Sequence, residues 1–252
     1  PILNQALASS NKIAHQPLTP EGEVFAAGAR RIAAEISATL LDLQQRATLD
    51  MGRVVIAAPP SLASSWLPNL LASFRADYPG ITLRLHDVVS DECLDMILRG
   101  DVDFGLNARP GNSREFTSQL LFNERLYVVC CTNDSLAGRK EVTLKDLRHR
   151  EFIHMVRTGS VWQQTQPMLT SSQTIDSGFE VNQFGTVAGL IAAGFGISIV
   201  PHYALPLCKR DDLTAVPISS KSAVRPMYVV ARRGRSLSAA AERMCERILK
   251  GA

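Results

Sequence analysis

The sequence predicts an α/β protein with two Rossmann-like lobes, joined by a two-strand hinge and preceded by one long helix. Strands and helices alternate after Gly52, which is the pattern of parallel sheets with right-handed crossover helices. Two strands of similar apolar pattern, Arg125–Cys131 and Pro226–Arg233, suit a hinge in which both segments cross between the lobes. Before Gly52, a single apolar stripe predicts the long helix.

The long helix has a clear start. Thr19 is expected to cap it, Pro20 to take its first position, and Glu21 and Glu23 to face the positive end of the helix dipole. Apolar residues then recur every three or four positions, at Ala29, Ile32, Ile36, Leu40, Leu43 and Ala47. We assign residues 19–50 to this helix. Its stripe either packs on its own domain or pairs two subunits, and its narrowness favours a dimerising linker.

The two lobes follow from the order of the strands and helices. The first lobe alternates strand and helix over residues 53–58, 61–78, 81–86, 90–99 and 101–106. The second lobe has strands at Phe152, Phe179 and Ile197, a helix from Ser160 and a helix over 185–194. A closing helix over 237–250 returns to the first lobe if both hinge strands cross. The first lobe is therefore assigned to residues 52–126 and 228–252, and the second to residues 127–227.

The composition indicates an ordinary soluble protein of a reducing compartment. The 252 residues are 46% hydrophobic, and a net charge of +3 gives no sign of a nucleic-acid-binding surface. The longest apolar stretch, 186–201, is interrupted by glycines and is shorter than a membrane helix requires, and no secretory signal opens the chain. We therefore expect no membrane partner. Five scattered cysteines without a CxxC pair favour the cytoplasm.

Cys130 and Cys131 allow two interpretations. They are either buried structural thiols or a redox pair. Consecutive residues of a strand point to opposite faces of the sheet, which favours the structural interpretation.

Motifs for catalysis, metal binding and nucleotide binding are missing from the sequence. It contains no GxSxG, HExxH, CxxC, DxDxDG, GxGxxG or GxxxxGK[ST] pattern, and its five histidines are dispersed. Asp101 and Asp103 could form a general acid/base pair, but their position at a strand start favours bonds to nearby backbone. We therefore expect no enzyme activity, no cofactor and no metal.

Polar groups remain at the carboxyl ends of strands, where open α/β sheets bind their ligands. Ser61 and Ser160 each begin a helix, one in each lobe, and each offers a hydroxyl beside free backbone N–H groups. The two serines either hold one anion between the lobes or merely cap their helices.

Five segments of the chain occur in an order and spacing that coincidence does not explain. They are LTPEGEVFAAGARRIAAEI, LPNLLASFRADYPGITLRL, LRGDVDFGL, TGS and TVAGLIAAGFGISIVP. Together they closely resemble LysR-type transcriptional regulators, over residues 17–250. The resemblance implies a winged helix-turn-helix that contacts DNA, a linker helix that pairs subunits into a homodimer or homotetramer, and an effector-binding domain similar to periplasmic solute-binding proteins. Residues 1–18 are interpreted as a remnant of the helix-turn-helix or a cut end of the chain.

The resemblance also implies an effector cleft between the lobes. Matched position by position, its lining is Pro59, Pro60, Ser61, Leu62, Asn107, Thr132, Ser160, Phe184 and Thr186. Hydroxyls and helix N-termini in such a set suit a small-molecule effector that is a carboxylate or another small anion.

The chain is therefore expected to be the ligand-sensing part of a DNA-binding transcriptional regulator, in which a bound anion alters the geometry of the oligomer. Two alternatives share the two-lobe fold. A transport-associated solute-binding protein should lack the long linker helix and usually carries an export signal. A small-molecule enzyme needs a reactive polar cluster, which the sequence does not supply.

Overall fold

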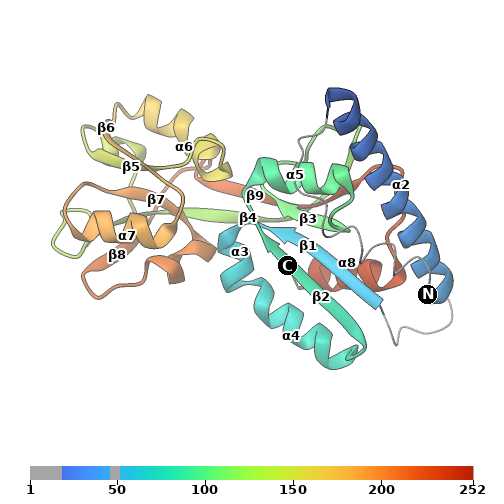
Figure 1. The fold of residues 1–252 in the computed structure, drawn as a ribbon. Helices are drawn as coiled ribbons and strands as arrows, with labels where there is room; N and C mark the ends of the chain where they lie inside the picture. The colour runs from blue at the N-terminus through green and yellow to red at the C-terminus, as the bar shows by residue number, and fades with distance from the viewer. Residues whose placement is uncertain (1–18, 46–51, 252) are drawn as a thin grey trace.

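The computed structural model describes residues 19–45 and 52–251, and it confirms two α/β lobes joined by two long strands (Figure 1). The interpretation of residues 1–18 lies outside the described residues, as do positions 46–50 of the predicted linker helix. Among the residues that are described, no helix is both long and apolar enough to cross a bilayer.

The linker helix is α2, Pro20–Gln45, and it lies along the first lobe (Figure 1). Its predicted cap is confirmed, because the Thr19 hydroxyl accepts a hydrogen bond from the backbone N–H of Gly22 at 3.1 Å. Ile32 and Ile36 of the apolar stripe remain 60% and 54% exposed. At these positions the stripe does not pack on its own domain, which favours pairing with a second helix.

The first lobe is built on four strands and on the first part of a fifth, the long hinge strand described below. β1 (Gly52–Ala58) pairs in parallel with β2 (Ile81–Asp87) and with β3 (Phe104–Asn107), and β9 (Val224–Arg232) joins β3 in the antiparallel sense. Successive side chains of β1 enter two different cores, one on each face of the sheet. Since both faces are buried, β1 reads as a continuous apolar run rather than an alternating one.

Helices cover both faces of this sheet. The core on one face is closed by α5 (Ser90–Arg99). The core on the other face is closed by α3 (Pro60–Ser65), α4 (Leu67–Asp77) and α8 (Ala239–Lys250). The C-terminal helix thus returns to the first lobe, which makes this lobe discontinuous in sequence.

The helix expected over 61–78 is interrupted at Trp66, between α3 and α4. The prediction of a single helix is wrong because Pro68 has no backbone N–H to bond the carbonyl of Ser64, and in a continuous helix its ring would clash with that carbonyl. The break places the Trp66 ring edge-on against Phe122 of the hinge, with 5.3 Å between ring centroids.

The two-strand hinge consists of β4 (Phe116–Cys131) and β9, which pair in the antiparallel sense. β4 begins earlier than predicted and continues into the second lobe, where it pairs with β7 (Ser198–Pro201) and β8 (Leu213–Pro217). Because β4 belongs to both lobes, the strands follow one continuous order, β2-β1-β3-β9-β4-β7, with β8 also on β4.

The second lobe packs its remaining elements around β4, β7 and β8. β5 (Glu151–Met155) and β6 (Ile175–Val181) form a separate parallel pair, and α6 (Ser160–Ser171) and α7 (Phe184–Ala192) lie beside them. Two 3₁₀ segments, η2 (Leu144–Leu147) and η3 (His202–Cys208), complete the lobe. β8 and both 3₁₀ segments were not predicted, because such short segments carry no clear periodicity.

Cys130 and Cys131 pack into different cores of the second lobe, as their alternation along the strand predicts. Burial raises the pKa of Cys130 to about 11 and the pKa values of Cys93 and Cys208 to about 12. All five cysteines are free. Thiols with such pKa values stay protonated at neutral pH, which favours the structural interpretation over a redox pair.

Candidate functional site

A cavity of about 40 Å³ lies between the two lobes, and we call it the interlobe cavity. The first lobe contributes the turn after β1 and the start of α5, while the second lobe contributes the starts of α6 and α7. The lining residues are Pro59, Pro60, Ser61, Val89, Ser90, Met155, Val156, Gly159, Ser160, Val161, Asn182, Phe184 and Arg225. This volume holds only a few water molecules.

Arg225, on β9, connects the two lobes at this cavity. Its Nε and Nη2 donate to Oε2 of Glu124 at 2.9 and 2.5 Å. Nη2 also donates to the Ser61 hydroxyl at 2.8 Å, and Nη1 donates to the Ser160 hydroxyl at 3.3 Å. The side chains of Arg225 and Glu124 are 2% and 0% exposed. A single buried guanidinium therefore binds the first helix of one lobe, a helix of the other and the hinge strand between them.

The burial of this ion pair is compensated by further hydrogen bonds. Glu124 and Arg225 stand opposite each other in the antiparallel ladder of β4 and β9. The second carboxylate oxygen of Glu124 accepts a hydrogen bond from the backbone N–H of Tyr203 at 2.7 Å. A buried pair is tolerated only when its geometry is good and its remaining polar atoms are satisfied, and both conditions hold here.

One donor of Arg225 is uncommitted. A guanidinium has five N–H donors. Four of them are used on Glu124, Ser61 and Ser160, and the fifth, on Nη1, has no partner among the described residues. Because Arg225 lines the interlobe cavity, this buried cationic group is a ready partner for a ligand oxygen.

Three helices begin at the interlobe cavity, and their N-termini add to its positive potential. The residues before α5, α6 and α7 are Val89, Gly159 and Gln183, and none of them caps its helix with a side-chain hydrogen bond. The first backbone N–H groups of each helix therefore lack an intrahelical partner. Together with the helix dipoles they favour an anion in the cavity.

The structure brings together more than half of the residues expected to line the cleft. Pro59, Pro60, Ser61, Ser160 and Phe184 all line the interlobe cavity. Neither serine caps its helix through its own hydroxyl, since both hydroxyls accept from Arg225 instead.

The other four expected residues lie outside this lining. Leu62 is fully buried in the core of the first lobe. Asn107 is buried behind the cavity wall, where its side-chain amide donates to the Ser90 carbonyl at 2.8 Å and ties the end of β3 to the start of α5. Thr132 and Thr186 are exposed. The resemblance to the family gives the position of each lining residue along the chain. Which side chains face the cavity depends on where each helix begins and how it is rotated about its axis.

Sequence reasoning missed Arg225 and Glu124. It started the second hinge strand at Pro226, one residue after Arg225, and the first at Arg125, one residue after Glu124. The sequence did contain a signal for this pair. Glu124 and Arg225 carry opposite charges, and each directly precedes one of the two strands that were expected to run side by side in the hinge. Their exact register is set by long-range pairing, which local pattern does not define.

The two aspartates considered as an acid/base pair have structural partners. Asp103 accepts a hydrogen bond from the backbone N–H of Val55 at 2.8 Å, and Asp101 accepts one from Nε of Arg99 at 2.8 Å. Within residues 19–45 and 52–251, no three histidine, cysteine, aspartate or glutamate side chains gather in a way that could hold a metal ion.

Two α/β lobes on a two-strand hinge, with a mainly apolar cavity between them that also presents a few polar groups, define a small-molecule-binding domain of the periplasmic-binding-protein type. Residues 47–252 match the LysR substrate binding domain, and the chain belongs to this family.

Several relatives of this chain are named as transcriptional regulators. The chain is 29% identical, over 89% of its length and 73% of the relative's, to the uncharacterized HTH-type transcriptional regulator YfeR of Shigella flexneri. Among solved structures it is similar to a Corynebacterium glutamicum OxyR C206 mutant (TM-score 0.75, 21% identity, 93% of this chain and 74% of that one). It is also similar to the CcmR regulatory domain of Synechocystis PCC6803 in complex with 2-PG (TM-score 0.72, 20% identity, 79% and 97%). At these identities the two structures show the shared fold.

Proposed function

We propose that this chain is the ligand-sensing part of a DNA-binding transcriptional regulator, and that its interlobe cavity binds a small organic anion. The observation that carries the proposal is the uncommitted N–H of Arg225, a buried cationic donor at the point where three helix N-termini meet. A carboxylate fits this site, because it accepts two or more hydrogen bonds and its charge is stabilised by the guanidinium and the helix dipoles. The CcmR structure, whose fold is similar, holds the small molecule 2-PG.

The small volume of the cavity suggests how binding is signalled. An organic acid larger than a few water molecules does not fit into about 40 Å³, so its entry changes the angle between the lobes. A ligand shifts a conformational equilibrium only by its difference in affinity for the two states. In this protein the difference in affinity between the two states arises at Arg225. Its hydrogen bonds to Ser61 and Ser160 hold the lobes together when no ligand is bound.

The wider organisation is part of the proposal. Lobe I comprises residues 52–126 and 228–252, lobe II comprises residues 127–227, and residues 19–50 form a linker that pairs two subunits. A homodimer or homotetramer places paired helix-turn-helix units on DNA, and a change of lobe angle alters their spacing. The protein acts in the cytoplasm and carries out no catalysis.

A thermal-shift screen tests the proposal. Short aliphatic, hydroxylated and aromatic carboxylates are each compared with their primary amides, which keep the shape but lose the charge. At a hundred times Kd, a binding acid is expected to raise the Tm by roughly 5–10 °C. Its amide is expected to raise the Tm much less.

The same samples distinguish a sensor from an enzyme. The acid is expected to be recovered unchanged after prolonged incubation with the protein. Conversion of the acid, or equal stabilisation by acids and amides, would contradict the proposal.

A further inference from the structure

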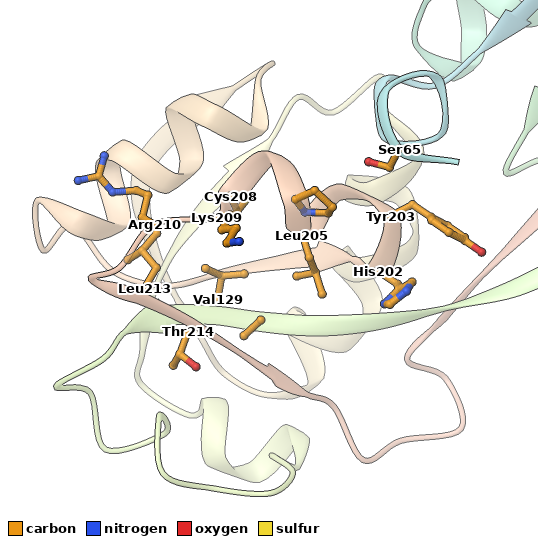
Figure 2. Close-up of a pocket in the computed structure, with 12 residues that line it drawn as sticks. Ser65, Val129, His202, Tyr203, Leu205, Cys208, Lys209, Arg210, Leu213 and Thr214 are labelled. Carbon is orange, nitrogen blue, oxygen red and sulfur yellow. The ribbon is translucent and has the colours of Figure 1, made fainter. Parts of the chain in front are cut away.

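A second cavity, of about 650 Å³, lies beside the hinge, and we call it the lateral cavity (Figure 2). It is formed by η3 and β8 of the second lobe, with Val129 of β4 below and Ser65 of α3 at one end. Its lining is Ser65, Val129, His202, Tyr203, Leu205, Pro206, Cys208, Lys209, Arg210, Leu213, Thr214 and Ala215. This volume is typical of sites for drug-sized molecules.

The lining combines an apolar surface with positive charge. Val129, Leu205 and Leu213 contribute aliphatic surface, and Figure 2 shows Leu205 and Lys209 above Val129. No aspartate or glutamate lines the cavity. An apolar molecule with an anionic end matches this arrangement, since its body is removed from water while its charge meets a cation.

Lys209 is the cation that is available to a ligand. It forms no ion pair and no side-chain hydrogen bond with any residue in the described part of the chain. Arg210, at the opposite end of the cavity from Tyr203 in Figure 2, is already engaged by both carboxylate oxygens of Asp212, at 2.9 and 3.0 Å. The lateral cavity therefore presents one ammonium group without an internal counter-charge.

The lateral cavity borders the groups that hold the lobes together. Its Tyr203 donates a backbone hydrogen bond to Glu124, the partner of Arg225. The Tyr203 ring also lies 6.4 Å from that of Trp66, at the break between α3 and α4. An occupant would thus contact residues connected to the hinge and to the first lobe without entering the interlobe cavity.

We propose that the lateral cavity is a second small-molecule site, which takes a compound with an apolar body and a single carboxylate. The carboxylate pairs with Lys209, and the apolar body lies on Val129, Leu205 and Leu213. This site is separate from the interlobe cavity of the proposed function, and its occupancy does not require the lobes to open.

Octanoate is a suitable probe, because its chain is too large for the interlobe cavity as it stands. Trp162→Phe leaves Trp66 as the only tryptophan, and its emission then reports on the neighbouring Tyr203. Saturable binding is expected by Trp66 fluorescence and by calorimetry. Octanol, which lacks the charge, is expected to bind more weakly.

Variants at exposed positions locate the probe. Ala215→Phe fills the lateral cavity and is expected to weaken octanoate binding at least roughly tenfold. Lys209→Glu reverses the charge and is expected to weaken it at least roughly threefold, while Lys140→Glu, an exposed lysine outside the lining, has no effect. Asn182→Phe fills the interlobe cavity and is expected to leave octanoate binding unchanged.

Three results would overturn the second site. The first is that octanoate shows no saturable binding to the parent protein. The second is that octanoate still binds both Ala215→Phe and Lys209→Glu, with both variants folded. The third is that only Asn182→Phe removes octanoate binding. The last result would place octanoate in the interlobe cavity, and it would support the proposed function while refuting the lateral site. If no acid in the thermal-shift screen binds while octanoate still does, the proposed function would be refuted and the lateral site supported.

Discussion

Arg225 and Glu124 face each other across the two hinge strands and form an ion pair that is almost completely buried, with Nη2 and Oε2 2.5 Å apart. The guanidinium reaches the first helix of one lobe through Ser61 and a helix of the other lobe through Ser160. The hinge is therefore also the place where the two lobes are bonded to each other.

Removing one partner of this pair is expected to destabilise the protein strongly. Arg225→Met leaves the Glu124 carboxylate buried without its counter-charge, which should lower the free energy of unfolding by about 3–5 kcal/mol in urea titrations. The double variant Glu124→Gln with Arg225→Met should recover much of this loss, because the glutamine oxygen still accepts from Tyr203. As a control, Arg243→Met breaks the exposed pair with Glu246 and should cost less than about 1 kcal/mol. Equal costs for the two arginine variants would refute the role of burial.

Filling the interlobe cavity is expected to abolish the response to the effector. Asn182 is exposed and lines the cavity, so Asn182→Phe should block the site without disturbing a core. The acid that stabilises the parent protein should no longer raise the Tm of this variant. Thr186→Phe is the matched control, because Thr186 is exposed on α7 but lies outside the lining. If Thr186→Phe alone abolishes the response, the ligand contacts the other side of α7.

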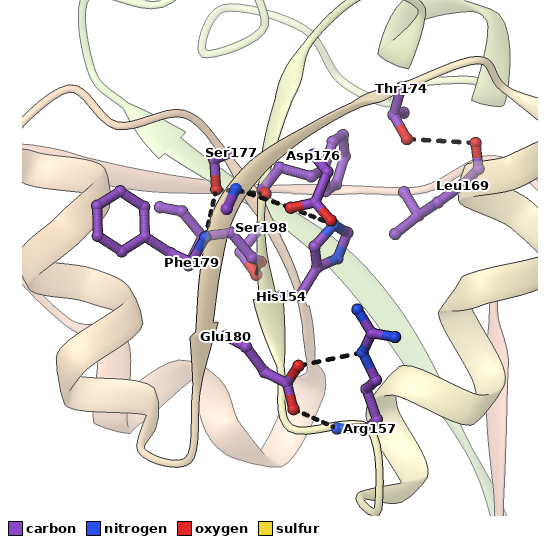
Figure 3. A network of polar contacts seen from close by, with 12 residues as sticks. His154, Arg157, Leu169, Thr174, Asp176, Ser177, Phe179, Glu180 and Ser198 are labelled. Atoms are coloured by element: carbon purple, nitrogen blue, oxygen red, sulfur yellow. Dashed lines mark hydrogen bonds and ion pairs between the residues drawn. The ribbon is translucent and has the colours of Figure 1, made fainter.

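His154 belongs to a polar network on the second lobe (Figure 3). Its ring lies edge-on to Trp162, with 4.8 Å between centroids, and its Nε2 is 3.6 Å from a carboxylate oxygen of Asp176. Burial lowers the pKa of His154 below its usual 6.5, while Asp176 acts in the opposite direction. Arg157, which pairs with Glu180 in the same network, also lowers it.

This shift predicts a loss of stability in mild acid. Below about pH 6.5 the unfolded state binds a proton at this histidine more readily than the folded state, so the free energy of unfolding falls as the pH is lowered through the folded pKa. His154→Gln should flatten this part of the stability–pH curve, and Asp176→Asn should steepen it by removing the favourable carboxylate. Urea titrations between pH 7 and pH 5 measure both slopes. An unchanged slope in His154→Gln would contradict the assignment.

Ile32 and Ile36, which are exposed on α2, are expected to help hold two subunits together. Glutamate in place of Ile32 and Ile36 should disrupt an apolar contact between two α2 helices. The double variant Ile32→Glu with Ile36→Glu should therefore shift the protein toward monomer in sedimentation velocity. Leu120→Glu adds a charge at a side chain that is 50% exposed on β4, and it should leave the distribution unchanged. A double variant that assembles like the parent protein would rule out α2 as the pairing element.

Most elements could be predicted from the sequence because their signals are local. The Thr19 cap, the stop of α5 at Gly100 and the continuous apolar run of β1 each depend on residues within one element. The order of strands and helices then gave two lobes, since crossover connections follow general rules. Ser61 and Ser160 could be placed at the cleft because a helix that begins just after a strand can also be recognised from neighbouring residues.

The break at Trp66 shows where local signals compete. The apolar residues over 61–78 favour one amphipathic helix, and Pro68 within the pattern favours an interruption. Packing of the Trp66 ring against Phe122, a residue distant in sequence, accompanies the interruption. A contact of this kind has no signature in the neighbouring residues.

The sequence by itself determined the family, the two-lobe plan, the capped linker helix and the two serines that line the cavity between the lobes, because each of these depends on order and periodicity along the chain. Only the tertiary structure decided that Arg225 and Glu124 come into register, and that Leu62 and Asn107 turn away from the cavity. The physical reason is that these positions depend on strand pairing and helix rotation between distant segments. Such features are fixed by packing of the whole domain rather than by the residues on either side.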